Sequence, residues 1–543
     1  MFPFRAEIIT IKKQFQRRAA LVTKENPIWW AGLQSLGKGL MGLPFRMLVF
    51  AFILGSIAMY GKSMLYHAYT PDLPWLLGGG GYIMSFGHLP THDIFSWTFP
   101  DKPWVLYQWL FEVIVTWLFL VLGNQLLIRV FMVLVLALYV LVPYWVQSAK
   151  RIPMLFTVPI ASAALFVAAI NMSLRPMIIT SVFLAVQFLL LQRHREQKLS
   201  FKTVFICLTL VYALWGNMHT GVTVGFISLG LMALGDWLEK SGIYRFEPAD
   251  PTIEGQPVCI SHYAMLLGAT FLASLANPYG WGIYTYLANL SSQGYLNDVI
   301  IELQSPNFHY INYGYFAGLL LLFILLMSRM RRVFSAQAML HLLVFSLATL
   351  FIQRFVVWAS LFYALILPVA LYHWWVSSGR NWEPFKNTVE RFDIYRPLFA
   401  AVCVITVILF LWMPHPRLKS LFYAHLGSCE PFAKGIAAYQ DKLKLPTDKA
   451  LELPEIGSCT LAMYPDEKVF MDTRFDFYGE KFTRESREAF QVKPGWQAFL
   501  DKWGINTVLI TPQWQLPYQL KQNNLYKTIY EDSDMIVLRR TKP

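Results

Sequence analysis

The sequence contains few charged residues for its length. Only 15% of its 543 residues are Asp, Glu, Lys or Arg, whereas a soluble globular domain carries roughly 25%. Hydrophobic residues make up 56% of the chain, and apolar runs recur along it. Runs of about 18 or more such residues are long enough to cross a lipid bilayer. The shortage of charge therefore excludes an ordinary soluble enzyme and predicts an α-helical polytopic membrane protein, with the lipid bilayer as a partner.

Several motifs of known chemistry are also missing. The five cysteines do not have the spacing of a metal site. The four glycines from Gly78 to Gly81 are not followed by Gly-Lys-Ser/Thr, which argues against a Walker-type ATP loop. These glycines predict either a flexible turn or a backbone that passes close to a ligand. No internal repeat is visible, and inverted repeats are a common feature of transporters.

The net charge of +13 arises from basic clusters in several separate segments. These clusters lie in residues 1–46, at Lys150-Arg151, from Arg193 to Lys198, and from Arg329 to Arg332. Basic short loops mark the cytoplasmic side of a membrane protein. Residues 1–46 lack the apolar core of a cleavable signal peptide. The pattern therefore predicts a cytoplasmic N-terminal segment and argues against nucleic-acid binding.

The candidate membrane spans are 47–66, 105–122, 126–147, 153–170, 176–192, 203–218, 221–237, 261–276, 313–328, 336–352, 355–375 and 398–413. The basic clusters near residues 150 and 195 both lie inside only if the region 104–147 crosses the membrane an odd number of times. One of its two segments is then a juxtamembrane or re-entrant helix, which leaves about eleven crossings. In this topology the membrane domain comprises 47–413, and its long outer loops are 67–103 and 277–312.

Residues 414–543 are predicted to form a separate soluble domain on the outer side. Short β-rich runs at 468–472, 507–511 and 535–540 alternate with helical patterns such as 495–503. This alternation indicates a small α/β domain. Cys429 and Cys459 both lie in it, and an extracytoplasmic location permits a disulfide between them. We therefore expect a multi-pass protein of the cell inner (plasma) membrane whose C-terminal domain is extracytoplasmic.

Polar residues gather at the outer ends of the predicted spans. The candidates are Asp72, His92, Asp93, Glu112, Arg175, Asn217, His219, Asn277, Glu302 and Arg354. An ionisable side chain at the edge of a span is costly unless it snorkels, pairs or lines a wet cavity. Each residue alone has a simpler interpretation as a helix cap or an interfacial residue, but together they predict a site. Arginine binds phosphate in a bidentate manner, and a neighbouring acid removes a proton from an incoming hydroxyl group.

The order of the motifs resembles that of the GT-C superfamily of multi-span glycosyltransferases, which use polyprenyl- or dolichyl-phosphate-linked sugars. More narrowly, the sequence is similar to a group of bacterial membrane proteins. The matching residues of the first outer loop and the next span are Asp72, Trp75, Gly81, Pro90, Asp93, Phe95-Ser96, Thr98, Trp109-Leu110 and Glu112. Motifs similar to those of the group follow at Arg175-Pro176, Asn217 to Gly221, Asn277 to Gly280, and Glu302 with Ser305-Pro306. The chain departs from the group at Thr70, where an acid is usual, and at Leu76-Leu77, near an expected His.

The resemblance implies roles for these candidates. Asp72 would be the catalytic base, and Asp93 a second acid that orients the acceptor or binds a divalent ion. The residues that would hold phosphate, sugar or other parts of the substrates are His92, Glu112, Arg175, Asn217, His219, Asn277, Glu302 and Arg354. The pattern identifies no metal ligands, so no cofactor is assigned, and a divalent cation stays an open alternative.

In the C-terminal domain, residues 468–479 resemble a Phe-x-Asp-x-Arg-x-Asp-x-Tyr element of the same group. Its closely spaced Asp472, Arg474, Asp476 and Tyr478 predict either a structural ion-pair turn or a substrate contact, and we favour the ion-pair turn. The group's motifs therefore cover nearly the whole chain.

The function that we expect is transfer of a sugar from a polyprenyl-phosphate donor to a lipid, glycan or protein acceptor on the extracytoplasmic side. The alternative enzyme is an O-antigen polymerase or ligase-like protein, which also binds polyprenyl phosphates with outer arginines and histidines. The alternatives without catalysis are a lipid transporter and a scaffold for assembly of cell-envelope polysaccharide. The departures at Thr70 and at the missing His keep the scaffold open.

Overall fold

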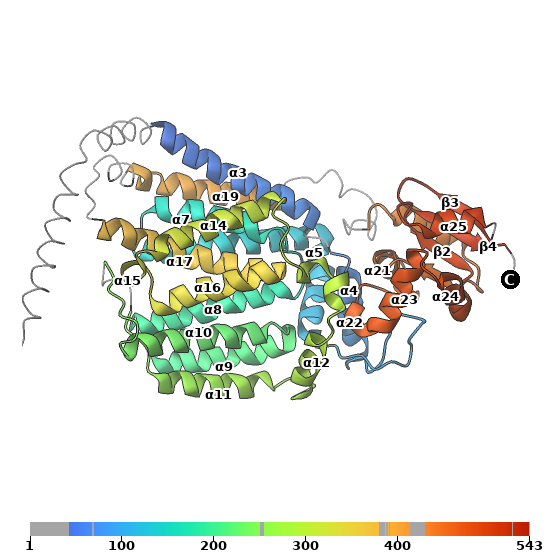
Figure 1. Ribbon diagram of the computed structural model, residues 1–543, viewed down its shortest axis with the longest axis horizontal. Helices are drawn as coiled ribbons and strands as arrows, with labels where there is room; N and C mark the ends of the chain where they lie inside the picture. The colour runs from blue at the N-terminus through green and yellow to red at the C-terminus, as the bar shows by residue number, and fades with distance from the viewer. Residues whose placement is uncertain are drawn as a thin grey trace, which may run out of the picture.

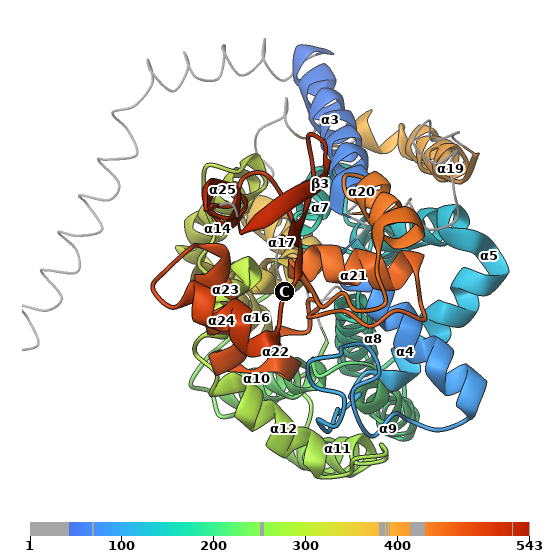
Figure 2. The same ribbon diagram turned by 90° about the vertical axis from the view of Figure 1, so that its right-hand side faces the viewer.

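The computed structural model describes residues 43–67, 70–249, 255–378, 386, 389, 391–412, 429–523 and 525–541. Within these ranges, long helices run side by side in a bundle, and the C-terminal domain lies at one end of it (Figure 1). Figure 2 shows the C-terminal elements from that end, in front of the helices. The predicted fold class is confirmed. Most of the N-terminal basic segment, 1–42, and the predicted domain boundary at 413–414 lie outside the described residues.

The predicted spans form helices, because a helix satisfies every backbone hydrogen bond within its own segment, as a lipid environment requires. The helices of the bundle are α3 (Leu43–His67), α5 (Trp109–Leu136), α6 (Val142–Ala149), α7 (Met154–Ala168), α8 (Met177–Arg195), α9 (Phe201–Met218), α10 (Val222–Lys240), α11 (Ile260–Ser274), α14 (Ile311–Met327), α16 (Ala336–Phe351), α17 (Val356–Ser377) and α19 (Arg396–Trp412). At the centre lies α17, whose side chains from Val356 to Ala370 are all buried.

In the described part of the chain, six helical stretches are long and apolar enough to cross a membrane, and shorter apolar helices of 10–17 residues accompany them. The longest stretch, Trp109–Ala149, joins the two predicted segments whose crossings were ambiguous. It is broken at Gly123, with φ 71° and ψ 164°, a conformation that glycine adopts readily. The break falls between the two predicted segments, and the total of about eleven crossings stays a prediction.

The first outer loop contains a helix, α4 (Leu73–Phe86), which includes all four glycines of the run. A Cβ atom on Gly79 would lie 2.1 Å from Glu112 Oε2, and one on Gly80 would lie 2.3 Å from the Glu112 carbonyl oxygen. The glycines therefore allow α4 to approach α5 closely. The flexible turn that we considered is therefore wrong, because the glycines lie in a helix that packs against its neighbour, whereas a backbone near a ligand stays a prediction.

The second outer loop contains α12 (Gly282–Ser291), α13 (Leu296–Val299) and the 3₁₀ turn η2 (Ile301–Leu303). A second 3₁₀ turn, η3 (Gln353–Phe355), precedes α17. The two turns are joined through Gln353, whose backbone N–H donates to the backbone carbonyl oxygen of Gln304 at 2.8 Å. This connection places Glu302 of η2 beside Arg354 of η3.

The C-terminal domain is built on a four-stranded sheet with the order β1 (Ala450–Glu452), β2 (Thr507–Ile510), β4 (Ile536–Arg540) and β3 (Tyr526–Glu531). Its helices are α20 (Ala433–Ala438), α21 (Pro454–Met463), α22 (Phe475–Tyr478), α23 (Glu480–Phe490), α24 (Trp496–Trp503) and α25 (Leu516–Gln522). β1 and β2 are parallel, and the other pairs are antiparallel. The strands predicted at 507–511 and 535–540 and the helix at 495–503 are confirmed.

The predicted strand at 468–472 is not part of the sheet. Its Val469 instead pairs with the first outer loop, accepting a hydrogen bond from Trp97 N and donating one to Phe95 O, both at 3.0 Å. The segment's β-forming residues therefore attach the domain to the membrane domain. Cys429 and Cys459 form the predicted disulfide, with their Cα atoms 5.4 Å apart.

Candidate functional site

An open pocket of about 500 Å³ borders the C-terminal domain, because Asp72 and Trp75 of its lining hydrogen-bond to Thr473 of that domain. The outer loops and the starts of α4 and α8 bring its polar residues together. Its lining comprises Asp72, Trp75, Leu76, Tyr107, Gln108, Arg175, Pro176, Met177, His219, Glu302 and Arg354. Five of the predicted site residues, Asp72, Arg175, His219, Glu302 and Arg354, therefore share one pocket.

Acids and arginines alternate around this pocket. Arg175 Nη1 lies 3.3 Å from Asp72 Oδ2, and Arg175 Nη2 contacts Glu302 Oε1. Arg354 donates from Nε and Nη2 to Glu302 Oε2 at 3.1 and 2.9 Å. The chain Asp72–Arg175–Glu302–Arg354 carries two positive and two negative charges, so the paired acids keep the arginines in place without an excess of charge.

The charges in the pocket are stabilised by one another. Burial alone would raise the pKa of Glu302, but attraction to Arg175 and Arg354 outweighs burial and lowers it to about 2. Burial opposes the charge of Arg175, but its pairs with Glu302 and Asp72 raise the pKa of Arg175 above its usual value. Glu302 is therefore ionised at any pH at which the protein is expected to work.

His219 is neutral in this setting. Burial lowers the pKa of His219, and the positive charges of Arg354 and Arg175 lower it further, to about 3. The Gly221 amide donates to Nδ1 at 3.2 Å, and Thr180 Oγ1 lies 2.7 Å from the same atom. Because Nδ1 accepts, the proton of the neutral ring lies on Nε2. His219 thus offers a neutral N–H donor beside two arginines.

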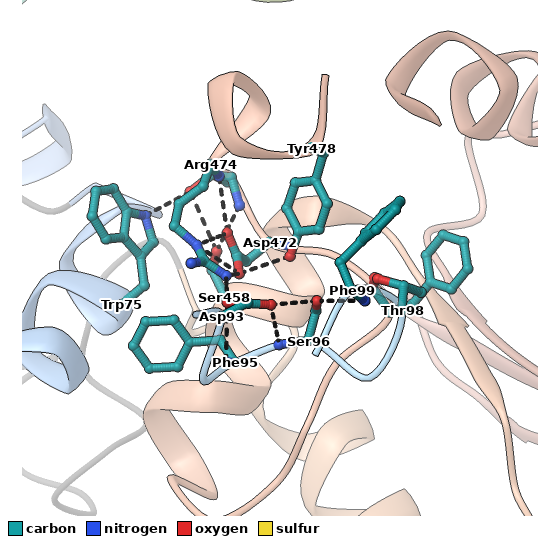
Figure 3. Close-up of polar contacts among 12 residues, drawn as sticks. Trp75, Asp93, Phe95, Ser96, Thr98, Phe99, Ser458, Asp472, Arg474 and Tyr478 are labelled. Atoms are coloured by element: carbon teal, nitrogen blue, oxygen red, sulfur yellow. Dashed lines mark hydrogen bonds and ion pairs between the residues drawn. The ribbon is translucent and has the colours of Figure 1, made fainter. Parts of the chain in front are cut away.

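Asp93 lies outside the pocket, in a buried cluster beneath the C-terminal domain (Figure 3). Its Oδ1 lies 2.7 Å from Arg474 Nη2, and its Oδ2 accepts from the amide and hydroxyl groups of Ser96 at 2.9 and 2.5 Å. Arg474 also pairs with Asp472, at 2.7 Å, and Tyr478 donates to Asp472 Oδ2 at 3.0 Å. Asp472 and Arg474 therefore form the structural ion-pair turn that we favoured, with Asp93 as a further partner of Arg474. Asp476 is not part of it and accepts a hydrogen bond from Tyr286 instead.

Glu112 and His92 also lie away from the pocket. Glu112 is fully buried behind its lining, where Oε1 accepts from Gln108 Nε2 at 3.2 Å. His92 is exposed, and its Nδ1 lies 2.9 Å from the hydroxyl of Thr91. The contact with Gln108 connects Glu112 to the pocket indirectly, whereas His92 has no such connection among the hydrogen bonds of the described residues.

Asn217 and Asn277 hold the backbone of neighbouring segments. Asn217 accepts from Trp109 Nε1 at 2.9 Å and donates to the Ala276 carbonyl oxygen at 2.7 Å, which joins α5, α9 and the end of α11. Asn277 Oδ1 accepts from the Tyr279 amide at 2.8 Å within its own turn. Neither side chain lines the pocket. Both asparagines therefore support the fold around it.

Other residues of the pocket escaped the sequence analysis. Tyr107 and Gln108 precede α5 and line the pocket, but a Tyr-Gln pair before an apolar run gives no signal by itself. Thr473 of the C-terminal domain donates a hydrogen bond to Asp72 Oδ1 at 2.6 Å. The charged residues beside it in the 468–479 motif indicate an ion pair, whereas a single threonine between them gives no signal in the sequence. In the described part of the chain, no three His, Cys, Asp or Glu side chains lie together as a metal site would require.

The fold and the pocket define a class: a polytopic helical membrane protein whose small α/β domain lies over an arginine-containing pocket. A scan against models of protein families finds no match, and neither does a search of curated proteins.

Solved structures do show similarity. One is the Archaeoglobus fulgidus oligosaccharyltransferase tethered to an acceptor peptide, at TM-score 0.46 and 10% identity, covering 91% of this chain and 74% of that one. The same organism's AglB with an inhibitory peptide and a dolichol-phosphate gives 0.44 and 11%, covering 92% and 75%. ArnT from Cupriavidus metallidurans bound to undecaprenyl phosphate gives 0.45 and 12%, covering 90% and 97%. All three TM-scores lie below 0.5.

Proposed function

We propose that the protein is a membrane glycosyltransferase that moves a sugar from a polyprenyl-phosphate donor to a lipid, glycan or protein acceptor on the extracytoplasmic side. The observation that carries this proposal is the pairing of Asp72 with Arg175 at 3.3 Å in one open pocket. A carboxylate that accepts a proton and a guanidinium that holds a phosphate are thus adjacent.

The arginines and His219 fit a phosphate ligand. Guanidinium groups are always charged and bind phosphate oxygens in a bidentate manner. Arg175 and Arg354 now share Glu302 as their partner, and an arriving phosphate would compete with this carboxylate for the same N–H groups. His219 would add a neutral hydrogen bond from Nε2.

Asp72 would act as the general base. It would take the proton from the acceptor's hydroxyl or amide group as that group attacks the anomeric carbon. The bond between this carbon and the phosphate oxygen would break, and its electron pair would stay on the phosphate, stabilised by the arginines. A positioned base contributes roughly 10²–10⁴-fold to such a rate. A single displacement inverts the anomeric configuration, so a product with retained configuration would contradict this mechanism.

The basic clusters support an orientation in the membrane. Lys150 pairs with Glu196 at 2.8 Å, and Arg331 accepts a backbone hydrogen bond from Glu247, so several basic loops meet at one end of the bundle. In Figure 1 this end, marked by α15 (Met330–Val333), lies opposite the C-terminal domain. The rule that basic loops are cytoplasmic then supports an outer location for the pocket.

The first test is native mass spectrometry of the full chain with undecaprenyl phosphate as the probe. We expect the wild type and Asp72→Asn to retain the lipid, and Arg354→Ala to lose it. Arg484→Ala is a matched control, because Arg484 pairs only with its helical neighbour Glu480 on an exposed surface among the described residues. Binding lost equally in the control and in Arg354→Ala would reject a specific phosphate site. Absence of the lipid from intact wild-type protein would favour the scaffold or the transporter.

A further inference from the structure

Among the described residues, the C-terminal domain hydrogen-bonds to the pocket lining through the hydroxyl group of Thr473. Thr473 Oγ1 lies 2.6 Å from Asp72 Oδ1 and 3.5 Å from the Pro71 carbonyl oxygen. A hydroxyl group has one proton to donate, and the shorter contact assigns it to Asp72. We propose that Thr473 is a positioning residue for Asp72, so that the C-terminal domain completes the reactive end of the pocket. This inference rests on the proposed role of Asp72 as the base.

The carboxylate of Asp72 is held from outside its own helix. Asp72 is the N-cap residue of α4, yet its side chain makes no capping hydrogen bond to that helix. Its two oxygens instead accept from different segments, Oδ2 from Arg175 at 3.3 Å and Oδ1 from Thr473. One donor on each oxygen fixes both the position and the rotation of the carboxylate plane.

Thr473 also connects the two ends of the first turn of α4. Trp75 donates from Nε1 to Thr473 Oγ1 at 3.2 Å, and Thr473 donates onward to Asp72. Successive hydrogen bonds in one direction polarise each other, and the last acceptor is a charged group, for which hydrogen bonds are strongest. Since Trp75 lines the pocket as well, the Thr473 hydroxyl group holds two lining residues, Asp72 and Trp75, in place.

The backbone of Thr473 is held on both sides. Asp472 and Arg474 are buried in the cluster with Asp93 (Figure 3), and the Arg474 guanidinium lies 4.6 Å from the ring centre of Trp104. The Thr473 amide donates to Ser458 Oγ at 3.3 Å. A threonine between two immobilised residues keeps its hydroxyl group in one place, as a positioning role requires.

Occupation of the pocket would make Thr473 more important. A phosphate that engages Arg175 draws that guanidinium away from Asp72 Oδ2, which frees this oxygen for the acceptor's proton. Thr473 remains on Oδ1 and preserves the orientation. Loss of the hydroxyl group should therefore slow the chemical step and leave donor binding nearly intact.

The test compares Thr473→Val, Thr473→Ser and Thr460→Val in the full chain, with undecaprenyl phosphate-linked hexoses as donors. Thr460 is a matched control, because its hydroxyl group donates to the Ile456 carbonyl oxygen of α21 in the same domain. We expect kcat of Thr473→Val to fall about 10- to 100-fold, the range for a hydrogen bond to a charged group. KM for the donor should change less than about threefold. Thr473→Ser should restore most of the rate.

The outcomes separate this inference from the proposed function. Wild-type kcat in Thr473→Val, with Asp72→Asn inactive, overturns the role of Thr473 alone. A wild type without turnover, or an active Asp72→Asn, overturns the proposed function. In that case hydrogen exchange over residues 70–86 decides the positioning contact: faster exchange in Thr473→Val, and not in Thr473→Ser or Thr460→Val, supports it, and unchanged exchange overturns it.

Discussion

Glu302 provides the most direct test of the charge arrangement. In Glu302→Gln the side chain keeps its shape and one acceptor oxygen but loses the charge that Arg175 and Arg354 share. Lowering the pKa of Glu302 from 4.5 to about 2 corresponds to about 3 kcal/mol in favour of the folded, ionised state. Because the side chain is 22% exposed, solvent screening reduces this value, and we expect the variant to lose about 1–3 kcal/mol at pH 7.

The pH dependence follows from the direction of the shift. The folded-state pKa of Glu302 lies below its ordinary value, so the stabilisation is complete above about pH 4.5 and is lost as the pH falls toward about 2. The wild type should therefore lose stability in this window, and Glu302→Gln should lack this component. Thermal unfolding in a non-ionic detergent measures both effects. Glu480→Gln is the control, since its pair with Arg484 is exposed.

The same variant should bind phosphate more tightly. Without the carboxylate, the arginines have lost their strongest competitor for an incoming phosphate, and the pocket gains one unit of positive charge. We expect undecaprenyl phosphate to raise the unfolding temperature of Glu302→Gln more than that of the wild type. Equal stability of the two proteins at pH 7, or weaker lipid binding by the variant, would refute this account of the pocket.

Other predictions concern the framework around the pocket. Arg474→Met should destabilise the protein by about 3–5 kcal/mol, because it leaves buried acids without their cation; unchanged thermal unfolding would contradict this. Gly79→Ala should cost about 1–3 kcal/mol by overpacking, whereas Gly81→Ala, with nothing within 4 Å of the added Cβ, should be neutral or stabilising in the same unfolding assay. Replacement of Cys429 and Cys459 by Ala should destabilise the C-terminal domain by about 2–4 kcal/mol. A reductant should lower the unfolding temperature of the wild type and should leave that of the double variant unchanged.

The helices could be predicted from the sequence because lipid imposes a simple requirement. An apolar run such as 153–170 has to satisfy its backbone internally, and α7 (Met154–Ala168) follows it closely. The crossings at 105–147 could not be settled from the sequence, because the helix is broken at a single glycine, Gly123, and many glycines cause no break. The run Gly78 to Gly81 is ambiguous for a similar reason. Glycine is common in turns, but it also allows two helices to pack closely, as it does here.

The pocket could be predicted in part. Asp72, Arg175 and Arg354 are charged residues at the edges of spans, where pairing or a wet cavity is the usual reason for a charge. Asp93 and Asn217 are also polar residues near the ends of predicted spans. In the structure, however, Asp93 pairs with the buried Arg474, and Asn217 binds the backbone of Ala276. Only the three-dimensional structure distinguishes polar residues that line the pocket from polar residues that support the fold.

The contact between Asp72 and Thr473 joins residues 401 positions apart. At a synthesis rate of roughly 5–20 residues per second, the ribosome needs on the order of 20–80 s to make the intervening chain. The loop that holds Asp72 is therefore synthesised long before Thr473 exists. During biogenesis, a nascent chain that already contains Asp72 and Arg175 therefore still lacks the donor to Asp72 Oδ1. Synthesis of Thr473 thus sets the earliest moment at which this contact can form.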